Sequence, residues 1–475
     1  MFNILSVILL NGISIITGPL FSSLLGTSGF GVLKIYNIWA SVIAILFTLQ
    51  TNGTLVNARV EYSEEQQKGY QSSVLSLSLL VFGLCSALVL MGIRPISGLL
   101  KLEPMLICLM LLQALGTFCV NFLNTKYIYE FKAGRNMVLS LAITLVTLVL
   151  SVVFILQLPM ENRYYGRVVA IAATYAVIGI PAGAMILLQG RIFYHRNYWK
   201  FCIGLAIPAV FHNLSDLILG QSDQVMLQHM LGEAAVGRYG LAWTFGNIIF
   251  VIFGALNKTW CPFFFEEMKQ GQRDAMLAKT RNFLELFTIL ACGFILLTPE
   301  VYHIYAQDPD FWSGTMVIPL FVASYYINFL CTFPVNYEYY RMKTKVVAAV
   351  TIFSSLVNVG LNYILIRAVG MPGAALATAV SHGLQLLLHH CYCRKLGAED
   401  YPFPVAVWAK YALGFLTVMA VVYLTENTWL VRWGMGAVLG IFELLRLKKR
   451  KVLIDRKSTR LNSSHRCTSR MPSSA

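Results

Sequence analysis

Long apolar stretches fill this chain, and its lysines and arginines gather on every second connection between them. Roughly 14 of the stretches are long enough to cross a bilayer as helices. If the chain starts inside, alternate connections hold 24 of the 37 Lys and Arg residues, the opposite connections hold 8, and 5 lie after residue 454. Short loops rich in Lys and Arg remain in the cytoplasm. The pattern predicts a multi-pass inner-membrane protein with both termini in the cytoplasm.

Composition narrows the possible functions. Hydrophobic residues make up 57% of the chain and charged residues 12%. Because 14 spans use roughly 280 residues, no soluble domain of ordinary size fits in the remainder, and any chemistry must take place at the membrane. The formal net charge of +15 comes from basic residues at span ends on one side. That placement is typical of topology and lipid headgroup contact, so we expect no nucleic-acid partner.

Three segments could be mistaken for a signal peptide, for native sequence and for a metal site. The first apolar run, from Phe2 to about Leu25, lacks a basic start and a cleavage site, so it is predicted to be the first span rather than a cleavable signal peptide. Residues 455–475 resemble a translated sequencing adapter and are excluded as non-native. His389-His390-Cys391-Tyr392-Cys393 lacks a second ligand pair. We therefore read it as a helix end at the interface, and expect neither a metal site nor another cofactor.

An internal repeat divides the chain. Leu25-Gly26-Thr-Ser-Gly-Phe-Gly31 recurs as Leu231-Gly232-Glu-Ala-Ala-Val-Gly237, an offset of 206 residues. Gly166-Arg-Val-Val-Ala-Ile-Ala172 matches Gly373-Ala-Ala-Leu-Ala-Thr-Ala379, an offset of 207. Two distant matches at nearly one offset predict homologous halves of six spans each, as in many transporters. The predicted divisions are residues 1–198, 199–393 and a further helix pair within 394–454.

Three stretches carry a resemblance to a known family. They are Ser222-Asp-Gln-Val-Met-Leu-Gln-His-Met-Leu-Gly-Glu-Ala-Ala-Val-Gly-Arg-Tyr239, Ala255-Leu-Asn-Lys-Thr-Trp-Cys-Pro-Phe-Phe264 and Leu361-Asn-Tyr-Ile-Leu-Ile-Arg-Ala-Val-Gly-Met-Pro-Gly-Ala-Ala-Leu-Ala-Thr378. Over residues 1–450 the chain resembles the polysaccharide transporter (Wzx-type oligosaccharide flippase) branch of the multidrug/oligosaccharidyl-lipid/polysaccharide exporter superfamily. The resemblance implies an all-α, MATE-like polytopic fold, with two six-helix bundles facing each other across a central cavity and an added C-terminal helix pair.

The resemblance also implies a function. The expected substrate is an oligosaccharide on undecaprenyl pyrophosphate, moved across the bacterial cytoplasmic membrane by alternating access for capsule, exopolysaccharide or O-antigen biosynthesis. Expected partners are membrane lipids, the polysaccharide polymerase and glycosyltransferases of the same pathway, and a coupling H⁺ or Na⁺. Relatives often carry Asp-Arg where this chain has Asp223-Gln224. That departure weakens any placement of the substrate diphosphate there.

Ionisable residues inside spans are the first candidates for function, since charge in the membrane is costly. His212, Asp216 and Asp223 are spaced by four and seven residues, which predicts one helical face. We interpret this face as lining the cavity, with the three residues taking part in ion coupling. The alternative is a hydrogen-bonded structural cluster in which Asp223 caps the outer helix end.

Polar residues at the end of the second span are candidates for substrate binding. Arg59 lies seven residues after Asn52, with Asn57 between them. A guanidinium suits a diphosphate because it donates paired hydrogen bonds; the alternative for Arg59 is an ordinary positive-inside residue. Asn328, Asn358 and Asn362 in later spans could bind sugar hydroxyls or, alternatively, neighbouring helices.

Other functions remain open. A peptidoglycan lipid II flippase and an ion-coupled drug antiporter belong to the same superfamily. A membrane polysaccharide polymerase is a more remote alternative, because no large outward loop carries the acids, Arg or His that glycosyl transfer needs. We therefore expect a transporter and not an enzyme.

Overall fold

The computed structural model describes residues 2–271, 273–397, 401, 403–425 and 428–450. Within these ranges all regular structure is helical. The first part of the chain forms α1 (Phe2–Thr48), η1 (Thr51–Thr54), α2 (Leu55–Glu61), α3 (Glu64–Met91), α4 (Ile93–Leu100), α5 (Pro104–Tyr129), α6 (Ala133–Leu156), η2 (Met160–Asn162) and α7 (Arg163–Gly190). The remainder forms α8 (Arg196–Leu231), α9 (Glu233–Gln270), α10 (Arg273–Tyr305), η3 (Pro309–Val317), α11 (Ile318–Tyr340), α12 (Thr344–Val369), α13 (Met371–Leu396), α14 (Val405–Leu424) and α15 (Trp429–Arg450). The adapter-like residues 455–475 lie outside the described part.

Twelve of the described helices are long and apolar enough to cross a membrane. Two features explain the difference from the roughly 14 spans that the sequence predicts. Gly26, with φ 65° and ψ 178°, breaks the long helix α1 into two segments. The apolar part of α15, Trp429–Phe442, is shorter than the other spans. Counting both segments of α1 and α15 recovers the predicted number.

Local sequence explains where several helices begin. Ser63 and Gln66 form a capping box at the start of α3, satisfying backbone N–H groups that would otherwise have no partner. Pro104 occupies the first turn of α5, where a missing N–H costs nothing.

Exposed Leu80, Leu84 and Leu88 recur every fourth residue along α3. This apolar outward face is what a helix in contact with lipid requires.

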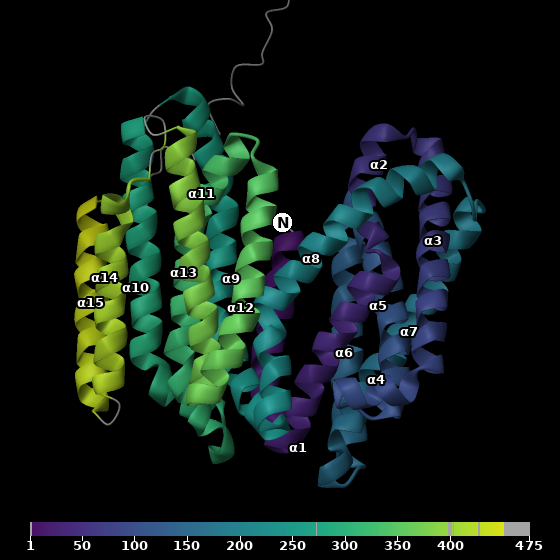
Figure 1. The fold of residues 1–475 in the computed structure, drawn as a ribbon, viewed down its shortest axis with the longest axis horizontal. Helices are drawn as coiled ribbons and strands as arrows, with labels where there is room; N and C mark the ends of the chain where they lie inside the picture. Colours follow the sequence, from purple (N-terminus) through teal and green to yellow (C-terminus); the bar gives the residue numbers. More distant parts are fainter. Residues whose placement is uncertain (1, 272, 398–400, 402, 426–427, 451–475) are drawn as a thin grey trace, which may run out of the picture.

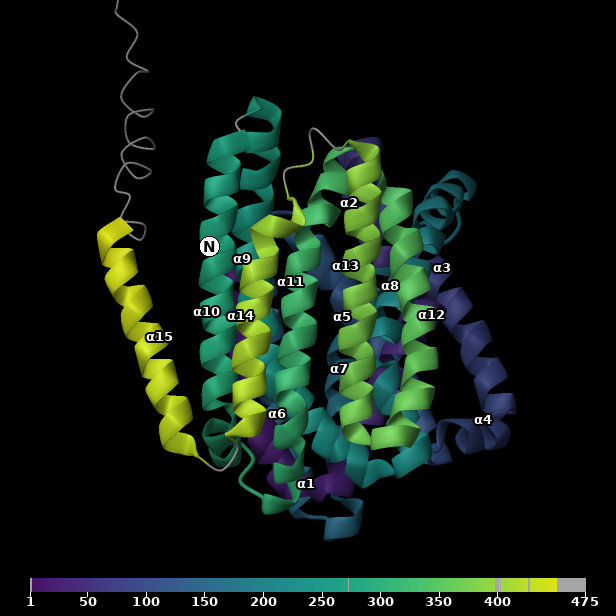
Figure 2. The ribbon, with the colours of Figure 1, turned by 60° about the vertical axis from the view of Figure 1, so that its left-hand side comes forward.

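The helices form two groups that meet at one end and diverge at the other (Figure 1). One group contains α2–α7, and the other contains α9–α13 with α14 and α15 packed on α10. Figure 2 shows α15 on the far side of α14 and α10. The predicted boundaries at 198/199 and 393/394 fall in the first turn of α8 and the last turn of α13.

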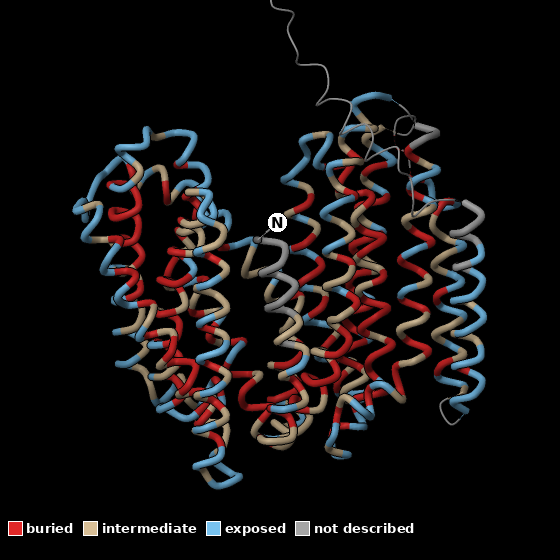
Figure 3. The backbone as a smooth tube through the Cα atoms, turned by 180° about the vertical axis from the view of Figure 1, so that it is seen from behind, coloured by how far each residue is buried: buried red, intermediate tan, exposed pale blue. Residues whose placement is uncertain are grey.

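Two long helices connect the groups. The main contacts between groups involve α1, which packs on α5, α6, α7 and α9, and α8, which packs on α3, α12 and α13. The start of α8 leans on the first group, where the Trp199 indole donates to the Ser73 carbonyl at 2.9 Å. Its end joins the second group. In Figure 3 the buried backbone follows the interior of each group, and exposed segments lie on the outer faces.

The meeting ends are joined by hydrogen bonds and close backbone packing. The connection between α4 and α5 touches the end of α8: the Gln228 amide donates to the Lys101 carbonyl at 3.3 Å, and His229 Nε2 lies 3.0 Å from the Leu99 carbonyl. Gly31 and Gly237 bring α1 and α9 together so closely that a Cβ on either would overlap the backbone of the other helix. The diverging ends carry the connections rich in Lys and Arg.

Candidate functional site

A basic pocket of about 360 Å³ lies at the diverging end, within the first group of helices. It is lined by Leu55, Arg59, Tyr62, Glu64, Gln67, Lys68, Gln71, Lys126, Tyr129, Glu130 and Lys132. Four cationic and two acidic side chains therefore surround it. We call it the inner-mouth pocket, and it contains Arg59, the residue that the sequence nominates for a diphosphate.

Its cations differ in their partners. Lys132 Nζ lies 2.6 Å and Lys126 Nζ 3.9 Å from the Glu130 carboxylate. Among the ion pairs of the described residues, none involves Arg59 or Lys68. Arg59 donates to the Tyr129 carbonyl and lies over the Phe131 ring, 5.3 Å from its centroid. Arg59 and Lys68 are exposed, so their charge is available to an anion.

The pocket is held by contacts between the short helix α2 and α3. The Gln67 amide donates to the carbonyls of Ala58 (2.7 Å) and Tyr62 (2.9 Å), which fixes the turn between the helices. Burial, with Glu61 and Tyr198 adding to it, raises the pKa of Tyr62. The phenol therefore stays protonated and can donate a hydrogen bond into the pocket.

The other two candidates of this segment lie near the pocket without lining it. Asn52 is half-buried in η1 and donates to Thr125 Oγ1 at 3.4 Å. Asn57 is exposed on α2. In the second group, Asn328 is half-buried on α11. Substrate binding by these three residues stays a prediction.

Asn358 and Asn362 lie in the interior of the second group. Both are 0% exposed on α12, and the Asn362 amide donates to Asn358 Oδ1 at 2.9 Å. Ser222 of α8 donates to the same oxygen at 3.2 Å, and Asn358 donates to Thr378 of α13 at 3.5 Å. These contacts join three helices. They favour the alternative in which the two asparagines bind neighbouring helices.

The three ionisable residues of α8 separate into two environments. His212 Nε2 lies 3.5 Å from Asp216 Oδ2, and both side chains are about half exposed, at 50% and 55%. Asp223 is 2% exposed; it accepts hydrogen bonds from the Tyr239 hydroxyl of α9 and from the backbone N–H of Gln224 at 2.8 Å. These contacts favour the alternative in which Asp223 belongs to a hydrogen-bonded structural cluster. His212 and Asp216 remain available for ion coupling.

Two of the eight cations that the sequence places in the connections opposite the Lys- and Arg-rich ones, Lys34 and Arg167, lie inside helices instead. Lys34 is in α1, where Nζ donates to Thr244 Oγ1 of α9 at 2.7 Å. Arg167 is in α7, with its guanidinium 4.0 Å from the centroid of the Phe21 ring. Neither is among the ion-paired residues of the described chain. These two positive charges, which the sequence pattern assigns to loops, thus lie within helices and contact neighbouring helices.

Glu338 is a buried acid that the sequence did not nominate. It is 0% exposed on α11, and its carboxylate oxygens lie 2.9 and 3.0 Å from His389 Nδ1 of α13. The Cys393 thiol contacts the same carboxylate at 3.6 Å. His389 therefore faces an acid on a neighbouring helix. Within the described residues no group of three or more His, Cys, Asp or Glu could hold a metal ion.

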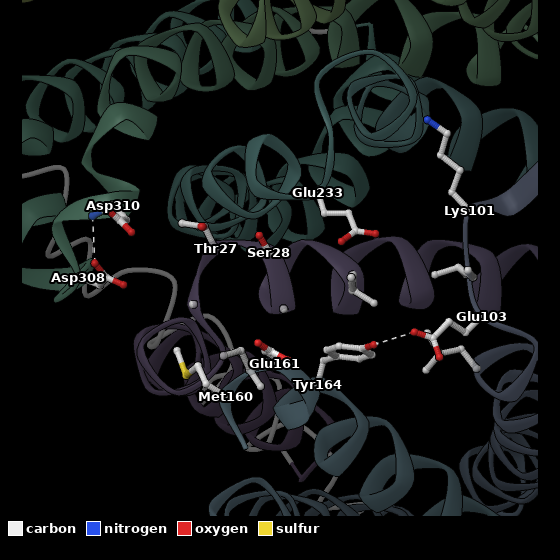
Figure 4. Close-up of a pocket in the computed structure, with 16 residues that line it drawn as sticks. Thr27, Ser28, Lys101, Glu103, Met160, Glu161, Tyr164, Glu233, Asp308 and Asp310 are labelled. Carbon is white, nitrogen blue, oxygen red and sulfur yellow. Dashed lines mark hydrogen bonds between the residues drawn. The ribbon is translucent and has the colours of Figure 1, made fainter. Parts of the chain in front are cut away.

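A second pocket, of about 540 Å³, lies where the two groups meet (Figure 4). Its charged lining is one cation and five acids, namely Lys101, Glu103, Glu161, Glu233, Asp308 and Asp310. The Tyr164 hydroxyl donates to Glu103 Oε1 at 3.2 Å, and the N–H of Asp310 donates to Asp308 Oδ1 at 3.0 Å. We call it the outer pocket. Its charge is opposite in sign to that of the inner-mouth pocket.

The first 268 residues match the family model described as "Polysaccharide biosynthesis protein". This match covers more than half of the chain. The chain belongs to the polysaccharide biosynthesis protein family. Among curated relatives of this family member, an "Uncharacterized membrane protein" of Haemophilus influenzae is 22% identical over 357 residues, covering 72% of this chain and 83% of the relative.

Solved structures show the fold that this family member shares. It is similar to "Lipid II flippase MurJ, inward closed conformation", with a TM-score of 0.67 and 15% identity, covering 94% of this chain and 98% of that one. It is also similar to an inward-facing multidrug resistance MATE family transporter of the MOP superfamily (TM-score 0.65, 15% identity, 82% and 95% covered). These likenesses confirm the MATE-like polytopic fold.

Proposed function

We propose that this protein flips an oligosaccharide linked to undecaprenyl pyrophosphate from the inner to the outer leaflet of the bacterial cytoplasmic membrane. The observation that carries the proposal is the inner-mouth pocket, whose Arg59 and Lys68 form no ion pair with any residue that the structure describes. The diphosphate is the part that all such substrates have in common, whatever glycan they carry. Guanidinium and ammonium groups at a half-open pocket are suited to bind it.

The arrangement of charge supports one direction of movement. Under the orientation that the positive-inside pattern predicts, the basic inner-mouth pocket faces the cytoplasm and the acidic outer pocket faces outward. A basic mouth raises the local concentration of an anionic headgroup. The acidic outer pocket disfavours its retention, so release follows once the outer end opens.

The shape supports alternating access without chemistry on the substrate. The two groups diverge at the end that carries the inner-mouth pocket and meet at the other (Figure 1). If the groups approached each other at the first end and separated at the second, where α1 and α9 meet, the substrate site would open to the opposite side, as in transporters built from repeats. The polyprenyl tail stays in the lipid throughout. Transport of this kind breaks no covalent bond, so we propose a transporter rather than an enzyme.

The decisive experiment replaces the chain's own candidate cations in a flippase-null strain. Arg59→Gln with Lys68→Gln should reduce transport roughly ten-fold or more, because each charge-assisted hydrogen bond is worth about 1.5–3 kcal/mol. The readout is the amount of lipid-linked oligosaccharide that accumulates in the membrane, at matched protein abundance. Arg135→Gln is the control, since Arg135 is an exposed cation of the same end that does not line the pocket.

Unchanged flux in the double variant would remove the role of the pocket. The wild-type protein must also restore transport of at least one glycan in the null strain. Failure with every tested glycan, at normal abundance, would overturn the flippase proposal and favour a drug antiporter of the same superfamily.

A further inference from the structure

A polar pocket of about 310 Å³ lies inside the first group of helices, between α1, α5, α6 and α7. Its polar lining consists of Asn37, Gln113, Thr117, Thr144, Thr147, Arg167 and the phenol of Tyr175. We call it the bundle pocket. It is separate from the inner-mouth and outer pockets, with which it shares no lining residue.

Arg167 gives the bundle pocket a positive charge with no internal counter-charge. Its Nη1 donates to Ser151 Oγ at 2.6 Å, while its buried Nε has no hydrogen-bond partner among the described residues. Among the residues that the structure describes, none of the carboxylates forms an ion pair with it. Charged groups within a membrane are normally paired or face a polar path. An anion from outside the chain would supply the missing partner.

Two further groups of the pocket lack partners. Gln113 is 9% exposed and Thr147 is 7% exposed, and within the described part of the chain neither Gln113 Oε1 nor Thr147 Oγ1 has a hydrogen-bond partner. Buried oxygens of this kind cost free energy until a donor satisfies them. A ligand for this pocket should therefore carry hydroxyl donors as well as a negative charge.

The size of the pocket selects among anions. At roughly 30 Å³ per molecule, a volume of 310 Å³ equals that of about ten waters. A monatomic ion would leave most of it unfilled. A single sugar ring with a carboxylate has the size, the charge and the hydroxyl groups that the lining requires.

A polar stripe leads from the inner mouth to this pocket. Gln113, Thr117, Asn121 and Thr125 follow one another at intervals of four along α5, which places them on one face of the helix. Thr125 accepts the hydrogen bond from Asn52, close to the inner-mouth pocket, and Gln113 and Thr117 line the bundle pocket. The stripe offers hydroxyl and amide partners along the length of the span.

We propose that the bundle pocket binds an acidic sugar unit of the transported headgroup, with the sugar carboxylate on Arg167 and sugar hydroxyls on Gln113 and Thr147. This assignment rests on the proposed function, because it names the chemistry of the same substrate. It also predicts that the glycan contains a uronic or similarly acidic sugar.

The test measures binding of glucuronate to the purified, detergent-solubilised full chain by ligand-induced thermal stabilisation. Glucose, acetate and chloride are the comparison probes. Glucuronate should stabilise the wild type, and its affinity should fall about ten-fold or more in Arg167→Gln. Arg367→Gln is the matched control, since Arg367 is an exposed arginine that lies over the Tyr363 ring on α12. It should bind glucuronate like the wild type.

Three results would overturn the proposal. They are equal stabilisation by glucose, stabilisation by acetate or chloride as strong as by glucuronate, and an affinity for glucuronate that does not change in Arg167→Gln. If Arg167→Gln does not fold, Gln113→Leu takes its place. That variant should bind glucuronate several-fold more weakly, and an unchanged affinity would count against the site. Complementation of the null strain with both neutral and acidic glycans tests the flippase function without measuring the bundle pocket, so the two proposals can fail independently.

Discussion

The buried pair of Glu338 and His389 shows that the surroundings of a residue decide its role. His389 stands in a His-His-Cys-Tyr-Cys run, and its partner is 51 residues away on another helix. Both side chains are 0% exposed. A buried pair of this kind is costly to break, because the residue that remains keeps its polarity in an apolar interior.

We predict that the two residues are strongly coupled in stability. Glu338→Leu and His389→Leu should each destabilise the protein by about 3–5 kcal/mol, whereas the double variant should recover most of that loss. The coupling free energy is measured by denaturant titration, in detergent, of the wild type, the two single variants and the double variant. Additive effects of the two substitutions would show that the pair does not act as a unit.

The candidate residues that the sequence predicts lie in different environments in the structure, for one physical reason. Spacing places residues on a helical face, but it does not say which neighbour covers that face. His212 and Asp216 stay half exposed, whereas Asp223, seven residues further on, is covered by Tyr239 of α9. Asn358 is likewise fixed by helices that the sequence pattern cannot place beside it.

At the scale of elements, the internal repeat has a counterpart in backbone conformation. Gly26 and Gly232, 206 residues apart, both have positive φ (65° and 87°) and extended ψ (178° and 177°). A positive φ is strained for residues with a Cβ. Each glycine ends one helical segment and starts the next. The repeated sequence therefore coincides with two junctions between helices that have the same backbone conformation.

The same repeat produces a reciprocal contact between α1 and α9. A Cβ on Gly31 would lie 2.0 Å from the Glu233 carbonyl oxygen, and one on Gly237 would lie 1.9 Å from that of Thr27. The offset of 206 residues relates Gly31 to Gly237 and Thr27 to Glu233. Each half thus contacts the other through equivalent residues, as a two-fold axis along the membrane normal requires.

We predict that Gly31→Val and Gly237→Val separate the outer ends of α1 and α9. The atoms in the way belong to the backbone, so the helices must move apart, at a cost of about 1–3 kcal/mol. Thermal stability and transport should both fall. Gly254→Val is the matched control on α9, because a Cβ there meets nothing within 4 Å. A loss as large in Gly254→Val would assign the effect to helix propensity instead.

The number and order of the spans could be predicted because each span in lipid must be a long apolar segment, and because basic residues gather in the connections on one side of the membrane. The depth of single charges could not. Lys34 looks like a loop residue by charge, but Gly240 leaves room for its side chain and Thr244 accepts a hydrogen bond from its ammonium group, so Lys34 lies within α1. Those partners belong to α9, which comes beside α1 only once the fold is complete.

At the scale of the whole molecule, the exposure of Asp216 indicates which side of the membrane has access to the interior. Asp216 lies 15 residues before the end of α8, or about 22 Å along the helix axis. An exposed carboxylate at that depth needs water rather than lipid around it. The end of α8 is joined to the first group through Gln228 and His229, so water must come from the diverging end.

We therefore predict that a single cysteine at Asp216 reacts with a membrane-impermeant thiol reagent from the cytoplasmic side only. The ten native cysteines are first replaced. Lys132→Cys, which lines the inner-mouth pocket, should react from inside, and Asp310→Cys, which lines the outer pocket, from outside. These two positions fix the orientation independently of the conformation. If both behave as expected but position 216 reacts from outside, the resting transporter is open outward, and water does not reach Asp216 from the diverging end as the structure indicates.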